Sequence, residues 1–312
     1  MRKIDLESIP YREELHEINK IFNVKKVTKN TRTLAEREIH HNKIVGSLEE
    51  AVQRAGLKNG MTISFHHHFR NGDYVVNMVV DKLAEMGYRD LVLAASSLTD
   101  CHAPLIKHIE NGVIRRIETS GLRGKLAEAV SHGLMDVPVV FRSHGGRAGA
   151  IEKGELPIDV AFLGAPSCDP YGNANGYIRD TAEGIMCGSM GYAKSDATYA
   201  DKVIIITNHI VHYPNTPFAI PESDVDYIVK VDEIGDPAGI MTGATRYTTN
   251  PKELLMAELA SKVSFASGRF QDGFSFQTGT GGASLAVTRF LKDKMLEKGI
   301  KASFALGGIT GS

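Results

Sequence analysis

Apolar and polar positions follow two alternating periodicities from about residue 59 onward. Short runs rich in Leu, Ile, Val and Ala are typical of buried strands, and between them apolar residues recur at helical spacing. Strands are predicted at residues 61–66, 90–96, 113–118, 137–142, 158–164, 203–207 and 227–231, and helices at residues 73–86, 103–110 and 122–132. Apolar strands that alternate with amphipathic helices predict an α/β fold, with a parallel sheet covered by helices on both faces.

The stretch before this pattern is polar. Residues 1–46 mix charges of both signs and sustain no apolar stripe, so we interpret them as an N-terminal extension that packs on something else. The first clean element begins at Ser47, because Ser47 and Glu50 have the spacing of a capping box. Gly56 then supplies a stop signal for a short helix.

Two stretches far apart in the chain repeat the same pattern. Asn59-Gly-Met-Thr-Ile63 matches Asp272-Gly-Phe-Ser-Phe276 at an offset of 213 residues, and Asp81-Lys-Leu-Ala-Glu-Met-Gly87 matches Asp293-Lys-Met-Leu-Glu-Lys-Gly299 at an offset of 212. Both copies have the order turn, strand, loop, helix, glycine, strand, which indicates an internal repeat. The alternative is that any two βαβ units share such turn and cap residues.

The repeat predicts the domain organisation. We expect an extension at residues 1–46, a first α/β domain at residues 47–250, and the start of a second, similar domain at residues 251–312. The second copy stops after its second strand, and two strands with one helix enclose no core of their own. We therefore expect the natural chain to continue beyond Ser312, with the second domain truncated here.

Composition and charge narrow the class of protein. Hydrophobic residues make up 42% of the chain and charged residues 23%, as in an ordinary globular protein, and the net charge of -1 gives no general attraction to nucleic acid or membrane. No apolar run reaches the ~18 to 20 residues of a membrane helix, and the first residues lack the apolar core of a signal peptide. The cysteines Cys101, Cys168 and Cys187 are too far apart for a disulfide framework or a zinc site. We expect a cytoplasmic protein.

A run of histidines follows the first predicted strand. Phe65-His-His-His-Phe69 lies where open parallel sheets bind ligands, and strand alternation would send His66 and His68 to one side and His67 to the other. Three interpretations are open: a metal site, a loop that contacts an anion or handles protons, and ordinary packed or solvated histidines. No nearby carboxylate at a recognisable spacing supports a metal, so we predict none.

Three other loops are candidates for a site. Gln277-Thr-Gly-Thr-Gly-Gly282 occupies the equivalent place in the second copy, where glycines and the following helix would bring N–H groups to a phosphate or carboxylate. Arg142-Ser-His-Gly-Gly-Arg147 sets two arginines around a glycine pair, which suits carboxylates. A long polar loop runs through Asp169, Gly172 and Asn173. Each loop has a plain alternative as a simple turn of the chain.

These loops together resemble those of coenzyme A transferases, and several stretches resemble the citrate lyase α chain family more closely. The closer likeness is carried by residues 64–73, 141–147, 164–175 and 274–282. It extends over essentially the whole chain, and the combination of loops is specific although no single loop is. The resemblance implies CoA-transferase-like parallel sheets flanked by helices, in two tandem similar domains with the site between them.

The resemblance also implies a reaction. An acetyl thioester, on an acyl carrier protein or on CoA, exchanges with citrate to give citryl thioester and acetate. Transferases of this kind are thought to work without a covalent enzyme thioester, so that orientation and N–H groups around the oxyanion supply much of the rate. The open alternatives are another acyl-CoA:carboxylate CoA-transferase, an acyl-CoA hydrolase, a sugar-phosphate isomerase, and a non-catalytic assembly module.

The same resemblance implies partners. These are the acyl carrier protein (γ chain), with its phosphoribosyl-dephospho-CoA prosthetic group, and the citryl lyase β chain that releases oxaloacetate. No cofactor is expected to bind tightly to this chain, a homo-oligomer is expected, and nucleic acid and membrane are not expected as partners. The 312-residue chain alone is expected to have little activity.

This chain departs from the general CoA-transferase pattern in two respects. His67-His68-Phe69 stands where general CoA transferases carry Gly-Gly-Phe, so the loop is adapted to a different substrate pair. Many of those enzymes use a glutamate nucleophile in the second half, which is mostly beyond this sequence. The catalytic nucleophile is therefore unassigned.

Citrate brings about three negative charges, which a nearly neutral protein must meet with local positive groups. The predicted substrate-binding residues are His66, His67, His68, Asn71, Arg142, Ser143, His144, Arg147, Asp169 and Asn173. The loop residues predicted to contact the thioester, a phosphate or the oxyanion are Gly145, Gly146, Gly279, Thr280, Gly281 and Gly282. On this basis replacement of Arg147 is expected to weaken the use of citrate far more than thermal stability.

Overall fold

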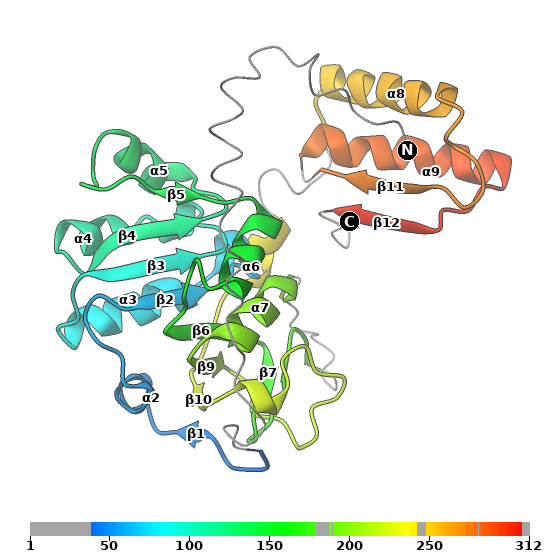
Figure 1. Ribbon diagram of the computed structural model, residues 1–312. Coiled ribbons are helices and arrows are strands. Elements are labelled where there is room, and N and C mark those ends of the chain that lie inside the picture. Colours follow the sequence, from blue (N-terminus) through cyan, green and yellow to red (C-terminus); the bar gives the residue numbers. More distant parts are fainter. Residues whose placement is uncertain (1–38, 179–186, 189, 242–247, 280, 308–312) are drawn as a thin grey trace.

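The computed structural model describes residues 39–178, 187–188, 190–241, 248–279 and 281–307. The described chain forms one large sheet with its helices and, after residue 250, a smaller βαβ unit (Figure 1). No helix within these ranges is long and apolar enough to cross a membrane.

The large sheet is parallel throughout and has eight strands in the order β1-β10-β9-β6-β2-β3-β4-β5. Its strands are β1 (Ile44–Val45), β2 (Thr62–Phe65), β3 (Leu91–Ala95), β4 (Ile114–Thr119), β5 (Val140–Phe141), β6 (Val160–Ala165), β9 (Lys202–Thr207) and β10 (Tyr227–Lys230). The predicted parallel sheet is therefore confirmed. The strand predicted at residues 137–142 is shorter than expected. Only Val140 and Phe141 pair with β4.

Both faces of the sheet are covered, as the apolar runs predict. Along β6, Val160 and Phe162 point into one buried cluster, and Ala161 and Leu163 point into the other. The first cluster is closed by α2 (Leu48–Ala55), α3 (Val75–Glu85), α4 (Leu105–Glu110) and α5 (Gly124–Ser131). The second is closed by α6 (His144–Glu152) and α7 (Gly191–Tyr199). The sequence pattern predicted α3, α4 and α5 but not α6 or α7.

The order of the strands reverses at β2. From β2 the chain moves outward through β3 and β4 to β5, and it then returns to β6 on the other side of β2. In open parallel sheets the loops at the carboxyl ends of the two strands flanking such a reversal separate, and ligands bind in the crevice between them. The histidine run directly follows β2, so the topology places it at this switch point.

The N-terminal part of the described chain adds the edge strand. β1 pairs with β10 through Ile44 and Ile228. The N-cap of α2 is Ser47, whose Oγ accepts the N–H of Glu50 at 3.1 Å, as predicted. The Glu50 carboxylate reaches one residue further back than in a standard capping box and accepts the N–H of Gly46. Gly56 ends the helix in the left-handed conformation, at φ 70°.

The C-terminal unit consists of α8 (Pro251–Ala266), β11 (Ser275–Thr278), α9 (Gly282–Lys298) and β12 (Phe304–Gly307), with β11 and β12 parallel. The turn before β11 has the same hydrogen-bonding arrangement as the turn before β2. Asn59 Oδ1 accepts the N–H of Arg89 at 2.9 Å, and Asp272 Oδ1 accepts the N–H of Lys301 at 2.8 Å. The two βαβ units thus share their turn chemistry, while the assignment of residues 251–312 to a second tandem domain stays a prediction.

A contact between two glycines locks the loop after β2. This loop forms the short 3₁₀ helix η3 (Arg70–Gly72) and packs against η6 (Pro237–Met241), which follows β10. The carbonyl of Gly72 accepts the N–H of Asp236 at 2.8 Å. A Cβ atom on Gly72 would lie 2.0 Å from the Asp236 carbonyl oxygen, and one on Gly239 would lie 2.2 Å from the Gly72 nitrogen. Only glycine fits at either position.

Replacing Gly72 by alanine should therefore destabilise the fold. Because backbone rather than a flexible side chain blocks the new methyl group, we expect a loss of at least about 1–3 kcal/mol in the free energy of unfolding. Gly149→Ala in α6 is the control, since a Cβ there meets no atom within 4 Å and helix propensity favours alanine. Denaturant unfolding of both variants is the measurement, and equal midpoints would contradict the close packing described here.

Candidate functional site

Two neighbouring strands hold the histidine loop at the switch point. The rings of His66 and His68 stack at 5.0 Å, with their Nδ1 atoms 2.8 Å apart. His67 instead turns to Ser96, which follows β3: its backbone N–H donates to Ser96 Oγ at 3.1 Å, and its Nδ1 lies 2.5 Å from the same oxygen. The alternation expected of a continuing strand does not apply here, because β2 ends at Phe65 and the ring of His67 lies 5.4 Å from that of His66.

Burial determines the charge of this loop. Desolvation, reinforced by the neighbouring rings, lowers the pKa of His66 well below its ordinary value and that of His67 to about 3. Desolvation also lowers the pKa of His68 to about 4, although Asp73 and the Gly164 backbone oppose the shift. The three rings are uncharged at neutral pH. The positive charge that the sequence suggested for this loop is therefore absent, and the rings act as neutral hydrogen-bonding groups.

The N-terminus of α6 lies at the same edge of the sheet. The ring of His144, the first residue of α6, lies 6.5 Å from that of His67 and 5.2 Å from that of Tyr192 on α7. Ser143 caps the helix by accepting the N–H of Gly146 at 3.0 Å. The N–H groups of His144 and Gly145 make no hydrogen bond with the described residues. They offer the positive end of a helix dipole to an anion.

The sequence suggested a flexible turn at this point. The glycine pair instead begins α6, because the Ser143 side chain replaces a missing backbone acceptor and stabilises the first turn. Residues 143–146 are exposed, so Ser143, His144, Gly145 and Gly146 are all accessible to a ligand. The ring of His144 lies near the histidine loop, and the role of these residues as ligand contacts stays a prediction.

Arg147 has a different environment from the one expected. Its side chain is 1% exposed and forms a two-point ion pair with Asp196 of α7, with Nη1–Oδ2 at 3.1 Å and Nη2–Oδ1 at 2.8 Å. Nη2 also donates to the carbonyl oxygen of Ala94 on β3 at 2.9 Å. The guanidinium therefore ties α6 and α7 to the sheet beneath the site. It is not a free positive charge for a ligand.

Arg142 is also neutralised locally. Its Nε donates to Glu118 Oε2 at 3.1 Å, and its Nη1 lies 3.9 Å from Glu155 Oε2. Glu118 is on β4, so the arginine joins the loop before α6 to the neighbouring strand. Neither predicted arginine supplies an unpaired charge in the structure.

Asp169 and Asn173 organise their own loop after β6. The Asp169 side chain is buried and accepts five hydrogen bonds, from the backbone of Tyr171, Gly172, Asn173 and Asn215 and from the amide of Asn173. The Asn173 side-chain oxygen accepts the N–H of Glu222 at 3.0 Å. Asp169 and Asn173, which the sequence analysis assigned to a ligand, thus form hydrogen bonds within the chain. A direct contact of either residue with a ligand stays a prediction.

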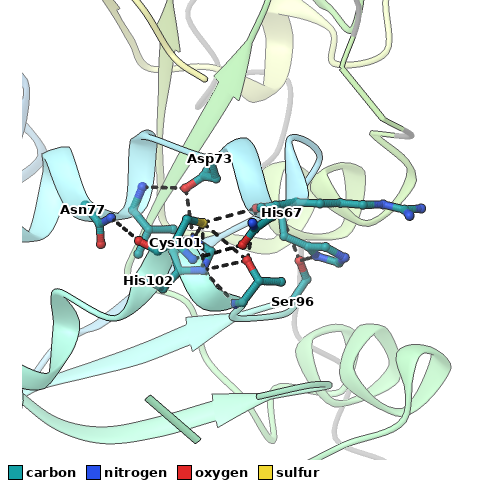
Figure 2. A network of polar contacts seen from close by, with 10 residues as sticks. His67, Asp73, Asn77, Ser96, Cys101 and His102 are labelled. Atoms are coloured by element: carbon teal, nitrogen blue, oxygen red, sulfur yellow. Dashed lines mark hydrogen bonds and ion pairs between the residues drawn. The ribbon is translucent and has the colours of Figure 1, made fainter. Parts of the chain in front are cut away.

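A buried polar network beside the histidine loop escaped the sequence analysis (Figure 2). His102 is fully buried between Asp73 Oδ2, 3.3 Å from its Nε2, and the Thr99 N–H, which donates to its Nδ1 at 2.9 Å. Asp73 Oδ2 also accepts the N–H of Val76 at the start of α3. Asn71 Oδ1 accepts the N–H of Cys101 at 3.1 Å. The network fastens the loop after β3 to the loop after β2.

Cys101, His102 and Asp73 have the composition of a nucleophilic triad but not its geometry. The Cys101 sulfur lies 3.6 and 3.7 Å from the two ring nitrogens of His102, so it is aligned with the lone pair of neither. The sequence feature that could have revealed the buried network is the capping-box spacing of Thr99 and His102. Within the described ranges, no group of three or more His, Cys, Asp or Glu side chains is arranged to hold a metal ion.

The glycine-rich loop of the second unit begins α9. Gly281 is the N-cap and Gly282 the first helical residue, while Thr280 lies outside the described residues. A cavity of about 510 Å³ beside Gly279 is lined by Thr278, Ser284 and several aromatic side chains. That this loop faces the histidine loop, as the repeat suggested, stays a prediction.

The fold and the switch-point loops define a chain with the acyl-CoA transferase fold. The acyl-CoA transferase of Escherichia coli O157:H7 superposes with a TM-score of 0.57 at 12% identity, over 88% of this chain and 64% of that chain. At this identity the likeness concerns the fold alone. Within that class, the family model of the citrate lyase α subunit matches residues 41–312, so the chain belongs to this family.

Relatives support the assignment at high identity. The citrate lyase α chain of Klebsiella pneumoniae is 62% identical over 278 residues, which are 89% of this chain and 54% of that protein. The structure of the α subunit of citrate lyase from Streptococcus mutans, solved in complex with citrate, is 57% identical with a TM-score of 0.84, over 92% of this chain and 56% of that chain. The chain spans about half the length of the curated relatives that it matches.

The environment of Arg147 changes what its replacement should do. In Arg147→Ala, the Asp196 carboxylate stays buried without its partner, so we expect the free energy of unfolding to fall by about 3–5 kcal/mol near neutral pH. Burial already raises the pKa of Asp196, and losing the guanidinium raises it further. The folded variant then binds a proton that the unfolded chain releases. Its stability falls as the pH rises from the unfolded pKa toward the raised folded pKa.

Urea unfolding of this variant at about pH 5 and about pH 7 tests both points, with the smaller deficit expected at the lower pH. Arg115→Ala is the control, because that arginine is 71% exposed and lies 3.8 Å from Asp90. Its stability should change by no more than about 0.5 kcal/mol. If the two variants unfolded alike, the ion pair between α6 and α7 would not support the fold.

Proposed function

We propose that the full-length protein is the citrate CoA-transferase subunit of a citrate lyase complex. It exchanges the acetyl group of an acetyl thioester for citrate and releases citryl thioester and acetate. The observation that carries the proposal is the membership of residues 41–312 in the citrate lyase α family, whose Streptococcus mutans relative was solved with citrate bound.

The site geometry supports an anionic ligand without a cluster of free cations. The exposed N–H groups of His144 and Gly145 lie at a helix N-terminus, and the neutral rings of His66 and His67 face the same edge. Hydrogen bonds from uncharged donors, together with the helix dipole, stabilise carboxylates without a fixed opposite charge. A carboxylate near these rings would also raise their pKa, so that binding favours proton uptake.

The proposed reaction is compatible with this arrangement. A citrate carboxylate oxygen attacks the thioester carbonyl and expels the thiolate, which leaves a mixed acetyl–citryl anhydride. The thiolate then attacks the citryl carbonyl of that anhydride and releases acetate, so atoms and charge balance. The protein orients the two reactants, and this orientation lowers the activation free energy by a large part. N–H groups such as those of His144 and Gly145 stabilise the oxyanion of each tetrahedral intermediate.

Partners and assembly are part of the same proposal. The thioester is carried by the phosphoribosyl-dephospho-CoA prosthetic group of an acyl carrier protein, and a separate β chain cleaves the citryl thioester. Residues 251–312 begin a second tandem domain whose glycine-rich loop, at Gly279 and Gly282, contributes N–H groups to the thioester side of the site. The complex is cytoplasmic and contains more than one copy of this chain.

The acceptor specificity of the full-length protein tests the function. With acetyl thioester as donor, citrate should be converted more than about 10²-fold faster than succinate, malonate or water, since only citrate matches all the hydrogen-bonding groups. Product thioesters are identified by mass spectrometry. Equal rates with succinate would indicate a general CoA transferase, and thioester loss without an acceptor would indicate a hydrolase; either result rejects the proposal.

The role of the α6 N-terminus is tested with a pair of variants. His144→Pro removes the ring and the N–H at the first helical position, where proline is well tolerated, whereas His144→Ala removes only the ring. Ser143 is already extended, as proline requires of its predecessor. We expect the proline variant to bind citrate at least tenfold more weakly than the alanine variant, because an N–H bond to a carboxylate is worth about 1.5–3 kcal/mol.

Thermal melting should be the same for both His144 variants, so that a loss of affinity is not a loss of structure. If both bound citrate equally well, the N–H of residue 144 would have no part in binding.

A further inference from the structure

Two arginines lie beside the histidine loop. Arg70 begins η3 directly after this loop, and Arg123 is the N-cap of α5 in the loop after β4. Both backbones bond to consecutive residues of the loop after β3, the strand between β2 and β4. The Arg123 N–H donates to the carbonyl of Leu98 at 3.0 Å, and the Thr99 hydroxyl donates to the carbonyl of Arg70 at 3.3 Å. The two arginines are therefore held together at the carboxyl edge of the sheet.

Neither guanidinium has a partner that cancels its charge. In the described part of the chain, the side chains of Arg70 and Arg123 form no ion pair and no hydrogen bond, unlike the two arginines around the start of α6. The Asp100 carboxylate packs against the backbone of Gly124 and forms an ion pair with neither. The Arg70 side chain is half-buried, and burial together with the charge of Arg123 lowers its pKa. A bound anion would relieve the repulsion between these like charges.

The backbone of Arg70 is strained. Its φ of 53° lies in the left-handed region, which glycine and asparagine adopt more readily than arginine. Hydrogen bonds hold this conformation: the Arg70 N–H donates to the carbonyl of His67 at 2.8 Å, and the Arg70 carbonyl accepts the Cys101 thiol at 3.4 Å as well as the Thr99 hydroxyl. Strain of this kind is concentrated at ligand sites, and here it fixes the direction in which the arginine leaves the backbone.

We propose that Arg70 and Arg123 form an oxyanion subsite that binds a carboxylate of the acceptor acid. Guanidinium groups are planar and bond the oxygens of carboxylates and phosphates at two points. His67 connects the subsite to the start of α6, because its carbonyl accepts the Arg70 N–H and its ring lies 6.5 Å from that of His144. The charge of Arg70 reaches this ring as well: after burial and the neighbouring rings, it is a further cause of the lowered pKa of His67.

The inference deepens the proposed function, and its assignment to the acid rests on that function. Citrate has three carboxylates, and the N–H groups at the start of α6 bind one of them in the proposed function. α6 closes one buried cluster of the sheet, whereas α3 and α5 close the other, so the arginines meet a second carboxylate from the opposite side of the histidine loop. The other source of an oxyanion is a phosphate of the thioester arm, which the experiment distinguishes.

Calorimetry of citrate binding to the full-length protein tests the subsite. Arg70→Asn removes the charge and suits the left-handed backbone, and Arg123→Gln removes a charge from an N-cap whose side chain makes no capping bond. Neither change should lower the unfolding temperature. Each should weaken citrate binding by at least about tenfold, because a charge-assisted hydrogen bond is lost. Arg115→Gln is the matched control, since this exposed arginine lies near the start of β4, at the opposite edge of the sheet, and its citrate affinity should equal that of the parent.

The same variants distinguish the two sources of the oxyanion. The double variant of Arg70→Asn and Arg123→Gln should lose less citrate affinity than the product of the two single effects, because the arginines share one ligand group. Unchanged citrate affinity with weaker binding of CoA would overturn the assignment to the acid. Unchanged affinity for both ligands in the two single variants would overturn the subsite itself.

Inorganic phosphate separates this inference from the proposed function. At equal ionic strength, phosphate in place of chloride should raise the unfolding temperature of the parent and of Arg115→Gln more than that of Arg70→Asn, since binding to the subsite adds to the general effect of the salt. If the parent bound no citrate but kept this difference, the proposed function would be rejected and the subsite would stand. Equal effects of phosphate on all three proteins would overturn the subsite.

Discussion

The ion pair between Arg147 and Asp196 determines the shape of the candidate site. Neither α6 nor α7 has a wide apolar stripe, and α6 contains three glycines at positions 145, 146 and 149. A buried two-point bond between them, extended to the carbonyl oxygen of Ala94, adds to the packing of Ala150, Ile151, Ala193 and Ala197 in holding both helices against the sheet. The N-terminus of α6 and the first turn of α7 lie at the histidine loop because of this bond. Breaking it would cost stability and would also release His144 and Tyr192 from the edge of the sheet.

The parts of the fold that follow from apolar spacing could be predicted from the sequence. β3 and β6 are continuous apolar runs and β9 has one at its centre, and their placement in a covered parallel sheet needed no further information. The start of α6 could not be predicted in this way, because His144-Gly-Gly has the composition of a turn and its helix depends on Ser143 and on a partner 49 residues away. Local composition does not reveal an ion pair with a residue far away in the sequence.

The candidate site shows the same division. The place of the histidine loop followed from strand order, since the carboxyl ends of parallel strands meet at one edge. Its charge did not follow, because a histidine in a sequence has no known degree of burial, and burial makes these three rings neutral. Arg142, Arg147 and Asp169 were predicted as ligand groups from their residue types. In the structure each has partners within the chain, and such pairing can be seen only when segments far apart in the sequence lie together.

The turns before β2 and β11 have the same hydrogen-bonding arrangement although their side chains differ. Asn59 and Asp272 differ in charge, yet each accepts the N–H of a residue shortly before the next strand, Arg89 or Lys301, and each is followed by a left-handed glycine. The strand residues next to them have changed freely, from Met-Thr-Ile to Phe-Ser-Phe. In both turns the path of the backbone depends on one acceptor oxygen and one glycine, so an amide and a carboxylate serve the same structural purpose there.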